Sequence, residues 1–380
     1  MKVDNIRPFT VAVPQAALDD LKDRLARTRW PEKETVADWD QGVPLAYARE
    51  LVDWWRDHHD WRRVEARLNA WPNFLATIDG LDIHFLHVRS ANPDARPLIL
   101  THGWPGSVLE FLDVIEPLSA DFHLVIPSLP GYGFSGKPAQ AKWSVEHIAN
   151  AWNALMLALG YDRYLAQGGD WGSAVTCAIG VAHGAHCAGI HVNMVVGAPP
   201  PEMMTDLSDT EKAYLARFDW YRTKDSGYST EQATRPQTIG YALTDSPVGQ
   251  MAWIVEKFHG WTDCGHQPGG RSIGGHPENA LSRDAMLDTV SLYWLTASAA
   301  SSARLYWQSF RSFVGGEIHV PTACSLFPNE IMRLSRRWAD KRYRNIVYWN
   351  EVERGGHFAA WEQPELFVAE LRAGFGVMPI

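Results

Sequence analysis

The feature that most restricts the fold is a five-residue segment, Gly168-Gly169-Asp170-Trp171-Gly172, between a predicted strand at 164–167 and a predicted helix at 173–181. It matches the pattern G-x-S-x-G of a sharp strand-to-helix turn, with Asp in the place of Ser. Such a turn holds the central side chain at the carboxyl edge of a sheet, where α/β sheets bind ligands. A helix N-cap would explain Asp170 alone, but it would not explain the flanking glycines.

Strands and helices alternate along the middle of the chain. Two apolar runs joined by Asp79-Gly80 predict a hairpin. The alternation predicts an α/β protein with a mostly parallel central sheet, and together with the turn at Asp170 it predicts the α/β-hydrolase fold. The expected elements are strands at 74–78, 81–88, 97–100, 123–126, 164–167 and 190–195 and helices at 145–159 and 173–181.

The pattern divides the chain into three parts. Residues 1–73 carry helical apolar stripes, and we expect an N-terminal helical meander that packs on the core. Residues 74–196 and 315–380 form the α/β core, because strand patterns return at 319–324 and 346–349. Residues 197–314 are helical, rich in Trp and Tyr, and contain a Gly-rich loop near 265–275. An insertion between late strands of a parallel sheet predicts a helical cap, or lid.

Composition narrows the classes of partner. The formal net charge of −9 argues against a nucleic-acid partner, because phosphate binding favours a basic surface. No apolar run is long enough for a membrane span or a signal peptide, so we expect a cytoplasmic protein with no membrane partner. The histidines show no metal-ligand spacing, and we expect no metal and no cofactor. The four cysteines are scattered, which favours buried thiols over a disulfide framework.

An aspartate at this turn has its own chemistry. A carboxylate displaces a leaving group from saturated carbon better than it attacks a carbonyl, and the product is an alkyl ester on the enzyme. Water must then hydrolyse that ester, which needs a general base. Asp170 is therefore the expected nucleophile, and the chain must supply a base elsewhere.

The base is expected near the C-terminus, following the order nucleophile, acid, histidine of this fold. His357, in Gly355-Gly356-His357-Phe358, lies shortly after the last predicted strand. Glu330 is the candidate acid that orients His357. Its sequence equally fits a solvated Glu at a helix start. Glu351 and Glu353 are rivals, but they lie close to His357 in sequence.

The segment His102-Gly103-Trp104-Pro105-Gly106 follows the first inner strand. In this fold, that loop and the residue after the nucleophile supply backbone amides that hold an oxyanion. Trp104 and Trp171 are therefore the expected oxyanion-hole residues. His102, Gly103 and Pro105 belong to the same substrate-side loop.

On these motifs the chain resembles epoxide hydrolases of the microsomal type, including their soluble bacterial and fungal relatives. The resemblance implies hydrolysis of an epoxide to a vicinal diol, supports Glu330 as the acid, and implies that Tyr228 and Tyr306 donate hydrogen bonds to the epoxide oxygen. It is close to full length and covers the N-terminal segment from Pro8-Phe9 to Trp71 and the motifs His102–Gly106, Pro130–Ser135, Gly168–Gly172, Asp245–Gly249 and Arg354–Ala360.

Two departures from these relatives stand out: no N-terminal membrane anchor is expected, and the loop at 263–279 is longer and richer in Gly. The expected reactants are water and a small apolar or aromatic epoxide, and a homodimer is the assembly considered. One alternative is a haloalkane or haloacid dehalogenase, which uses the same Asp, His and acid. Another is a non-catalytic ligand-binding protein with a hydrolase fold. The tyrosine pair favours the epoxide, because a departing halide needs no proton.

Overall fold

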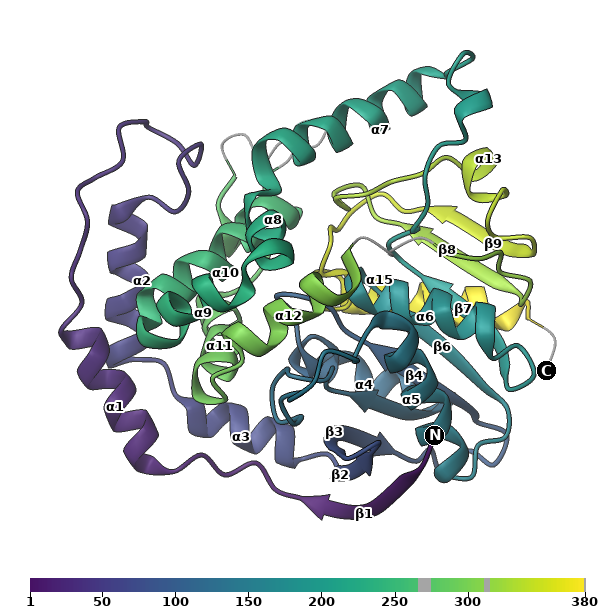
Figure 1. The fold of residues 1–380 in the computed structure, drawn as a ribbon, viewed down its shortest axis with the longest axis horizontal. Coiled ribbons are helices and arrows are strands. Elements are labelled where there is room, and N and C mark those ends of the chain that lie inside the picture. The colour runs from purple at the N-terminus through teal and green to yellow at the C-terminus, as the bar shows by residue number, and fades with distance from the viewer. Residues whose placement is uncertain (266–274, 311–314, 379–380) are drawn as a thin grey trace.

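The computed structural model describes residues 1–265, 275–310 and 315–378. Most of the Gly-rich loop predicted near 265–275 therefore lies outside the described residues. Figure 1 shows a central sheet covered by helices on both faces, with a further group of helices gathered at one end of the sheet.

In the described part of the chain, nine strands form one sheet in the order β1-β2-β3-β5-β4-β6-β7-β8-β9. From β5 to β9 neighbouring strands are parallel, while β1, β2 and β3 form an antiparallel edge. The mostly parallel sheet predicted from the sequence is present. The strands are Val3–Phe9 (β1), Asn73–Ile78 (β2), Leu81–Val88 (β3), Arg96–Thr101 (β4), Phe122–Pro127 (β5), Tyr164–Gly168 (β6), Cys187–Val192 (β7), Thr322–Leu326 (β8) and Ile346–Glu351 (β9).

The predicted hairpin is confirmed. β2 and β3 pair from Ile78 with Leu81 onwards. Asp79 and Gly80 both have positive φ angles, of 50° and 81°. Two consecutive positive φ angles match the right-handed twist of the flanking strands, which is why Asp-Gly is favoured at this turn.

Helices from distant parts of the sequence cover the two faces of the sheet. On one face, α4 (Leu112–Leu118) packs against α15 (Pro364–Gly376), which contacts β7, β8 and β9. On the other face, α5 (Val145–Ala158) packs beside α6 (Asp170–Ala182). Figure 1 shows α15 behind the sheet and α5 and α6 in front of it. The short helices η1 (Val108–Phe111), α13 (Arg336–Ala339) and α14 (Ala359–Glu362) lie in the core loops.

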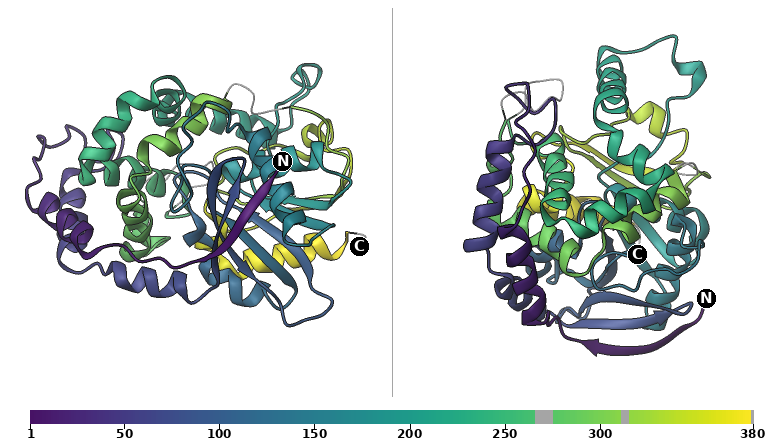
Figure 2. Two further views of the ribbon diagram at one scale, coloured as in Figure 1. Left: turned by 60° about the horizontal axis from the view of Figure 1, so that its bottom comes forward. Right: turned by 60° about the vertical axis from the view of Figure 1, so that its left-hand side comes forward.

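The chain leaves the sheet after β7 and returns at β8. The segment between them is largely helical and lies across the carboxyl end of the parallel strands (Figure 2). Its elements are η2 (Pro201–Met203), α7 (Asp209–Trp220), the π-helical turn η3 (Tyr221–Asp225), α8 (Gly227–Thr234), α9 (Pro236–Asp245), α10 (Pro247–Trp261), η4 (Pro277–Asn279), α11 (Arg283–Leu295) and α12 (Ala299–Ser309).

The N-terminal helices are α1 (Gln15–Ala26), α2 (Leu45–Asp57) and α3 (Trp61–Asn69), as the apolar stripes predicted. They pack against helices of the segment between β7 and β8. The indole Nε1 of Trp54 donates to Asp284 Oδ1 (2.7 Å), and that of Trp55 donates to Ser291 Oγ (2.8 Å). The strand β1 was not predicted, because its residues are mostly exposed and show no apolar alternation.

Candidate active site

The turn at Asp170 has the strained geometry that the sequence predicts. Asp170 directly follows β6 and Gly169, opens α6, and has a φ angle of 50°, which is unfavourable for a residue with a Cβ. A Cβ on Gly172 would lie 1.8 Å from the carbonyl oxygen of Thr101. One on Gly168 would lie 2.1 Å from the carbonyl of Gly172. The glycines therefore let the turn pass close to β4.

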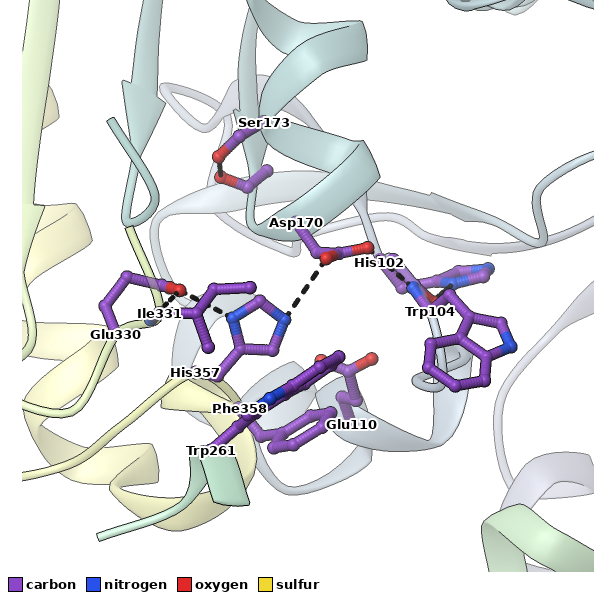
Figure 3. A network of polar contacts seen from close by, with 12 residues as sticks. His102, Trp104, Glu110, Asp170, Ser173, Trp261, Glu330, Ile331, His357 and Phe358 are labelled. Atoms are coloured by element: carbon purple, nitrogen blue, oxygen red, sulfur yellow. Dashed lines mark hydrogen bonds and ion pairs between the residues drawn. The ribbon is translucent and has the colours of Figure 1, made fainter. Parts of the chain in front are cut away.

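Among the described residues, two groups contact the Asp170 carboxylate. The backbone amide of Trp104 donates a hydrogen bond to Oδ1 at 2.8 Å. Nε2 of His357 lies 3.3 Å from Oδ2 (Figure 3). A side chain at Gly103 would collide with the carboxylate, because its Cβ would lie 2.2 Å from Asp170 Oδ1. The structure therefore brings together three segments that lie far apart in the sequence.

Glu330 contacts the other ring nitrogen of the histidine. Its Oε1 lies 2.7 Å from His357 Nδ1 and also accepts from the backbone amide of Ile331 at 2.7 Å. The side chains of His357 and Glu330 are only 2% and 1% exposed. A proton held on Nδ1 by Glu330 leaves Nε2 facing Asp170, as in a catalytic triad.

The two rival acids lie elsewhere. Glu351 is exposed and pairs with Tyr214 and Arg333 at 3.1 and 3.2 Å. Glu353 is exposed. Glu330 is therefore the acid that the geometry favours.

The charge state of His357 depends on both carboxylates. Burial alone would lower the pKa of the imidazole, but Glu330 and Asp170 outweigh burial and raise that pKa well above its ordinary value. Loss of either negative charge would lower the pKa of His357 again. The imidazole is thus sensitive to whether Asp170 is charged.

The loop before the helix η1 is fixed by its own histidine. His102 Nε2 accepts from the backbone amide of Leu129 at 3.1 Å, so Nδ1 carries the proton and donates to Gly103 O at 2.9 Å. Burial lowers the pKa of His102 to about 4, which keeps it neutral. In the same loop, the peptide bond between Trp104 and Pro105 is cis. His102 therefore holds the loop that presents the Trp104 amide to Asp170.

Tyr228 of α8 and Tyr306 of α12 lie together over this site, with ring centroids 5.8 Å apart. The Tyr306 hydroxyl is buried with no hydrogen-bond partner among the described residues. The Tyr228 hydroxyl lies 2.9 Å from that of Tyr221. Burial, together with the nearby Asp170 charge, raises the pKa of both phenols well above the ordinary value. Both are therefore protonated and able to donate.

The two tryptophans of the predicted oxyanion hole contact these tyrosines. The Trp104 ring stacks on Tyr228 at 4.8 Å, and the Trp171 ring meets Tyr306 edge to face at 4.8 Å. Trp171 is the second residue of α6 and is buried. The space above Asp170 is thus walled by aromatic rings.

Sequence reasoning missed Asp263, which follows α10. Its Oδ1 accepts from Asn329 Nδ2 at 2.6 Å, and its Oδ2 accepts from the backbone amide of Gly355 at 2.9 Å. Asn329 precedes Glu330, and Gly355 is two residues before His357. Asp263 therefore ties together the loops of the acid and the histidine, and no motif signals that role.

A second missed feature is a buried ion pair beside Tyr228. Lys257 Nζ lies 2.7 Å from Asp225 Oδ1 and 4.7 Å from the centroid of the Tyr228 ring. Asp225 Oδ2 also accepts from the indole of Trp261 at 2.6 Å. The pair fixes the turn at Tyr221–Asp225 from which α8 starts.

The described residues contain no group of three or more His, Cys, Asp or Glu side chains arranged to hold a metal ion. Over the same ranges, none of the helices has the length and apolar character that a membrane crossing requires.

Comparisons with known proteins identify the fold and the family of the chain. The family described as "Epoxide hydrolase N terminus" matches residues 6–111, and the family described as "alpha/beta hydrolase fold" matches residues 96–238. The predicted α/β-hydrolase fold is thereby confirmed.

Individual relatives extend the match over nearly the whole chain. A sequence of Stigmatella aurantiaca assigned to the epoxide hydrolases is 54% identical over 97% of this chain and 84% of that relative. Epoxide hydrolase 1 of Sus scrofa is 32% identical over 99% of this chain and 89% of its own. The solved structure of the Aspergillus niger epoxide hydrolase superposes with a TM-score of 0.88 at 34% identity, covering 99% and 97% of the two chains.

Proposed function

The chain belongs to the epoxide hydrolase family, and on that premise we propose that Asp170, His357 and Glu330 hydrolyse an epoxide to a vicinal diol in two steps. The observation that carries this proposal is the position of the Asp170 carboxylate, which has the Trp104 amide on one oxygen and His357 near the other. Water and an epoxide are the reactants of this family.

In the first step Asp170 attacks an epoxide carbon. A carboxylate oxygen forms a bond to that carbon, and the C–O bond of the ring breaks. The departing alkoxide is a poor leaving group unless it is protonated, so the phenols of Tyr228 and Tyr306 donate to it. The product is an alkyl ester on Asp170 with a free hydroxyl on the neighbouring carbon, whose proton came from one of the phenols. The proton that His357 loses once Asp170 is esterified restores that phenol.

In the second step water attacks the carbonyl carbon of that ester. Nε2 of His357 takes the proton of the water, and Glu330 stabilises the resulting imidazolium through Nδ1. The backbone amides of Trp104 and Trp171 hold the oxyanion of the tetrahedral intermediate. The acyl C–O bond then breaks, the diol oxygen takes the proton back from His357, and the new oxygen remains in Asp170. The proton left on the Asp170 carboxyl passes to His357, which restores the carboxylate nucleophile.

The helices α7–α12 act as a cap in this proposal, because they supply both tyrosines and the ring of Trp261 over the sheet edge. The aromatic walls, with Trp104 and Trp171 packed against the tyrosines, favour an apolar or aromatic epoxide. A cytoplasmic location and a homodimeric assembly stay predictions from the sequence.

An isotope experiment tests the function and the order of the steps together. Enzyme in excess over styrene oxide is mixed in ¹⁸O-water and allowed one turnover without added metal or nucleotide. We expect unlabelled diol and one ¹⁸O in the peptide that contains Asp170. Label in the diol from the first turnover would indicate direct attack by water. Halide release from haloalkanes with no diol from any epoxide would favour the dehalogenase.

A further inference from the structure

A small cavity lies against the proposed nucleophile. It has room for about one water molecule (about 20 Å³) and is lined by Asp170, His357 and a third titratable side chain, Glu110. Neither Tyr228 nor Tyr306 is among its lining residues. The cavity therefore differs from the space in which the tyrosines would meet an epoxide.

Glu110 is held in this cavity by its neighbours. Its Oε1 accepts from the backbone amide of Ser107 at 2.9 Å, at the start of η1. A Cβ on Gly106 would lie 1.6 Å from that oxygen, so the carboxyl fills the space that any side chain at 106 would need. Among the described residues no hydrogen bond reaches Oε2. Figure 3 shows the Glu110 carboxyl close to the His357 ring and on the same side of it as Trp261 and Phe358.

A general base alone does not fix the orientation of the water that hydrolyses the ester. A water that gives one proton to His357 Nε2 can still rotate about that hydrogen bond. A second acceptor fixes the other proton, and this directs the lone pair at the ester carbon. We infer that Glu110 holds the hydrolytic water in this cavity, with the water donating one proton toward His357 Nε2 and the other to Glu110 Oε2.

The electrostatics of the cavity change in the direction this role needs. Burial and the nearby Asp170 charge raise the pKa of Glu110 to about 8, while His357 acts in the opposite direction. Alkylation neutralises Asp170 and removes one of the two causes that raise that pKa. Proton transfer to His357 adds a positive charge that lowers it further. The imidazolium that forms as the water gives up its proton therefore lowers the pKa of Glu110 and makes it a better acceptor at that moment of hydrolysis.

The competing explanation is that Glu110 only caps η1. Ser107 and Glu110 form a capping box, in which Ser107 Oγ accepts from the helix backbone and Glu110 accepts from the Ser107 amide. The two roles make different demands. Capping needs both side chains, whereas holding the water needs Glu110 and the space at Gly106.

The inference rests on the proposed function, and rates of the separate half-reactions test it. The full chain in excess is mixed with styrene oxide, the reaction is quenched at intervals, and the ester on Asp170 is followed by intact-protein mass spectrometry. The variants are Glu110→Gln, Gly106→Ala and the matched control Ser107→Ala. Ser107→Ala removes the cap from the other side and leaves the Ser107 amide on Glu110.

For Glu110→Gln we expect alkylation within about twofold of wild type and ester hydrolysis slower by roughly ten- to hundredfold. Gly106→Ala displaces an intact carboxyl and should also slow hydrolysis, whereas Ser107→Ala should leave the balance of the two steps unchanged. Hydrolysis at the wild-type rate in Glu110→Gln overturns the inference. Equal slowing of both steps by Glu110→Gln and Ser107→Ala also overturns it in favour of capping. Failure of the proposed function is distinguishable, because the wild type would then form no ester on Asp170.

Discussion

Nε2 of His357 lies 3.3 Å from Oδ2 of Asp170, so the proposed base is in direct contact with the proposed nucleophile. The contact links the two chemical steps. While Asp170 is charged, it helps to raise the pKa of His357, and a protonated imidazole cannot accept a proton. Esterification removes that charge, the pKa falls, and His357 becomes a base when an ester exists to be hydrolysed.

The tyrosine pair should control alkylation. Tyr228→Phe or Tyr306→Phe removes one donor to the epoxide oxygen and should slow ester formation, and the double change should reduce it by roughly 10²–10⁴-fold. Stopped-flow fluorescence measures this step, because Trp104 and Trp171 contact the two tyrosines. Tyr214→Phe, remote from Asp170, is the matched control. Wild-type alkylation in the double variant would exclude the pair as donors.

Asp263 should act through the positions of Glu330 and His357. Asp263→Ala leaves the Asn329 side chain and the Gly355 amide without their acceptor, at a cost of about 1–3 kcal/mol in stability. Ester hydrolysis should fall more than alkylation, because only hydrolysis needs the aligned base. Rapid-quench rates and thermal melting measure the two effects. Asp219→Ala, which removes an exposed carboxylate of α7, is the control. An equal decrease in the rates of alkylation and hydrolysis would show that Asp263 does not specifically align the base.

Glu211 of α7 should make a pH-dependent contribution to stability. It accepts from Ser335 Oγ at 2.6 Å and from Arg337. The hydrogen bond from Arg337 lowers the pKa of Glu211 from 4.5 to about 2, against the effect of burial. An acid with a lowered pKa stabilises the folded state above its unfolded pKa and loses that effect as pH falls through the folded value.

Glu211→Gln should therefore lower Tm by roughly 2–4 °C at neutral pH. The difference from wild type should shrink as pH falls from about 4.5 toward about 2. Melting curves of both proteins across this range give the comparison. A Tm difference that is constant with pH would show that the carboxylate charge is not involved.

The sequence predicted the parts of the fold that local chemistry determines. The glycines around Asp170 predict the sharp turn because that turn excludes side chains. Asp79-Gly80 predicts the hairpin because its turn needs two positive φ angles. β1 was not predicted because it has no apolar face, and it is a strand because it pairs with β2. Its stability comes from a partner far along the chain, which no local pattern records.

The same distinction applies to the site. Asp170 and His357 lie in glycine-flanked motifs, and the structure places them in contact. Glu330 and its rivals could not be separated by spacing, because the choice depends on which carboxylate reaches Nδ1 of His357. Glu110 lies in a capping-box pattern that indicates only the start of a helix, and Asp263 lies in no motif. Their roles arise from where η1 and the end of α10 meet the two catalytic loops.

The most direct measurement of the central claim is the mass of the intact His357→Gln protein after incubation with an epoxide such as styrene oxide. Asp170 can still attack carbon in this variant, but no base activates water, so the ester should accumulate. We predict one added substrate mass that maps to the peptide containing Asp170, and none in the matched double variant Asp170→Ala/His357→Gln. An unmodified His357→Gln protein beside an active wild type, or an adduct on another residue, would contradict covalent catalysis by Asp170.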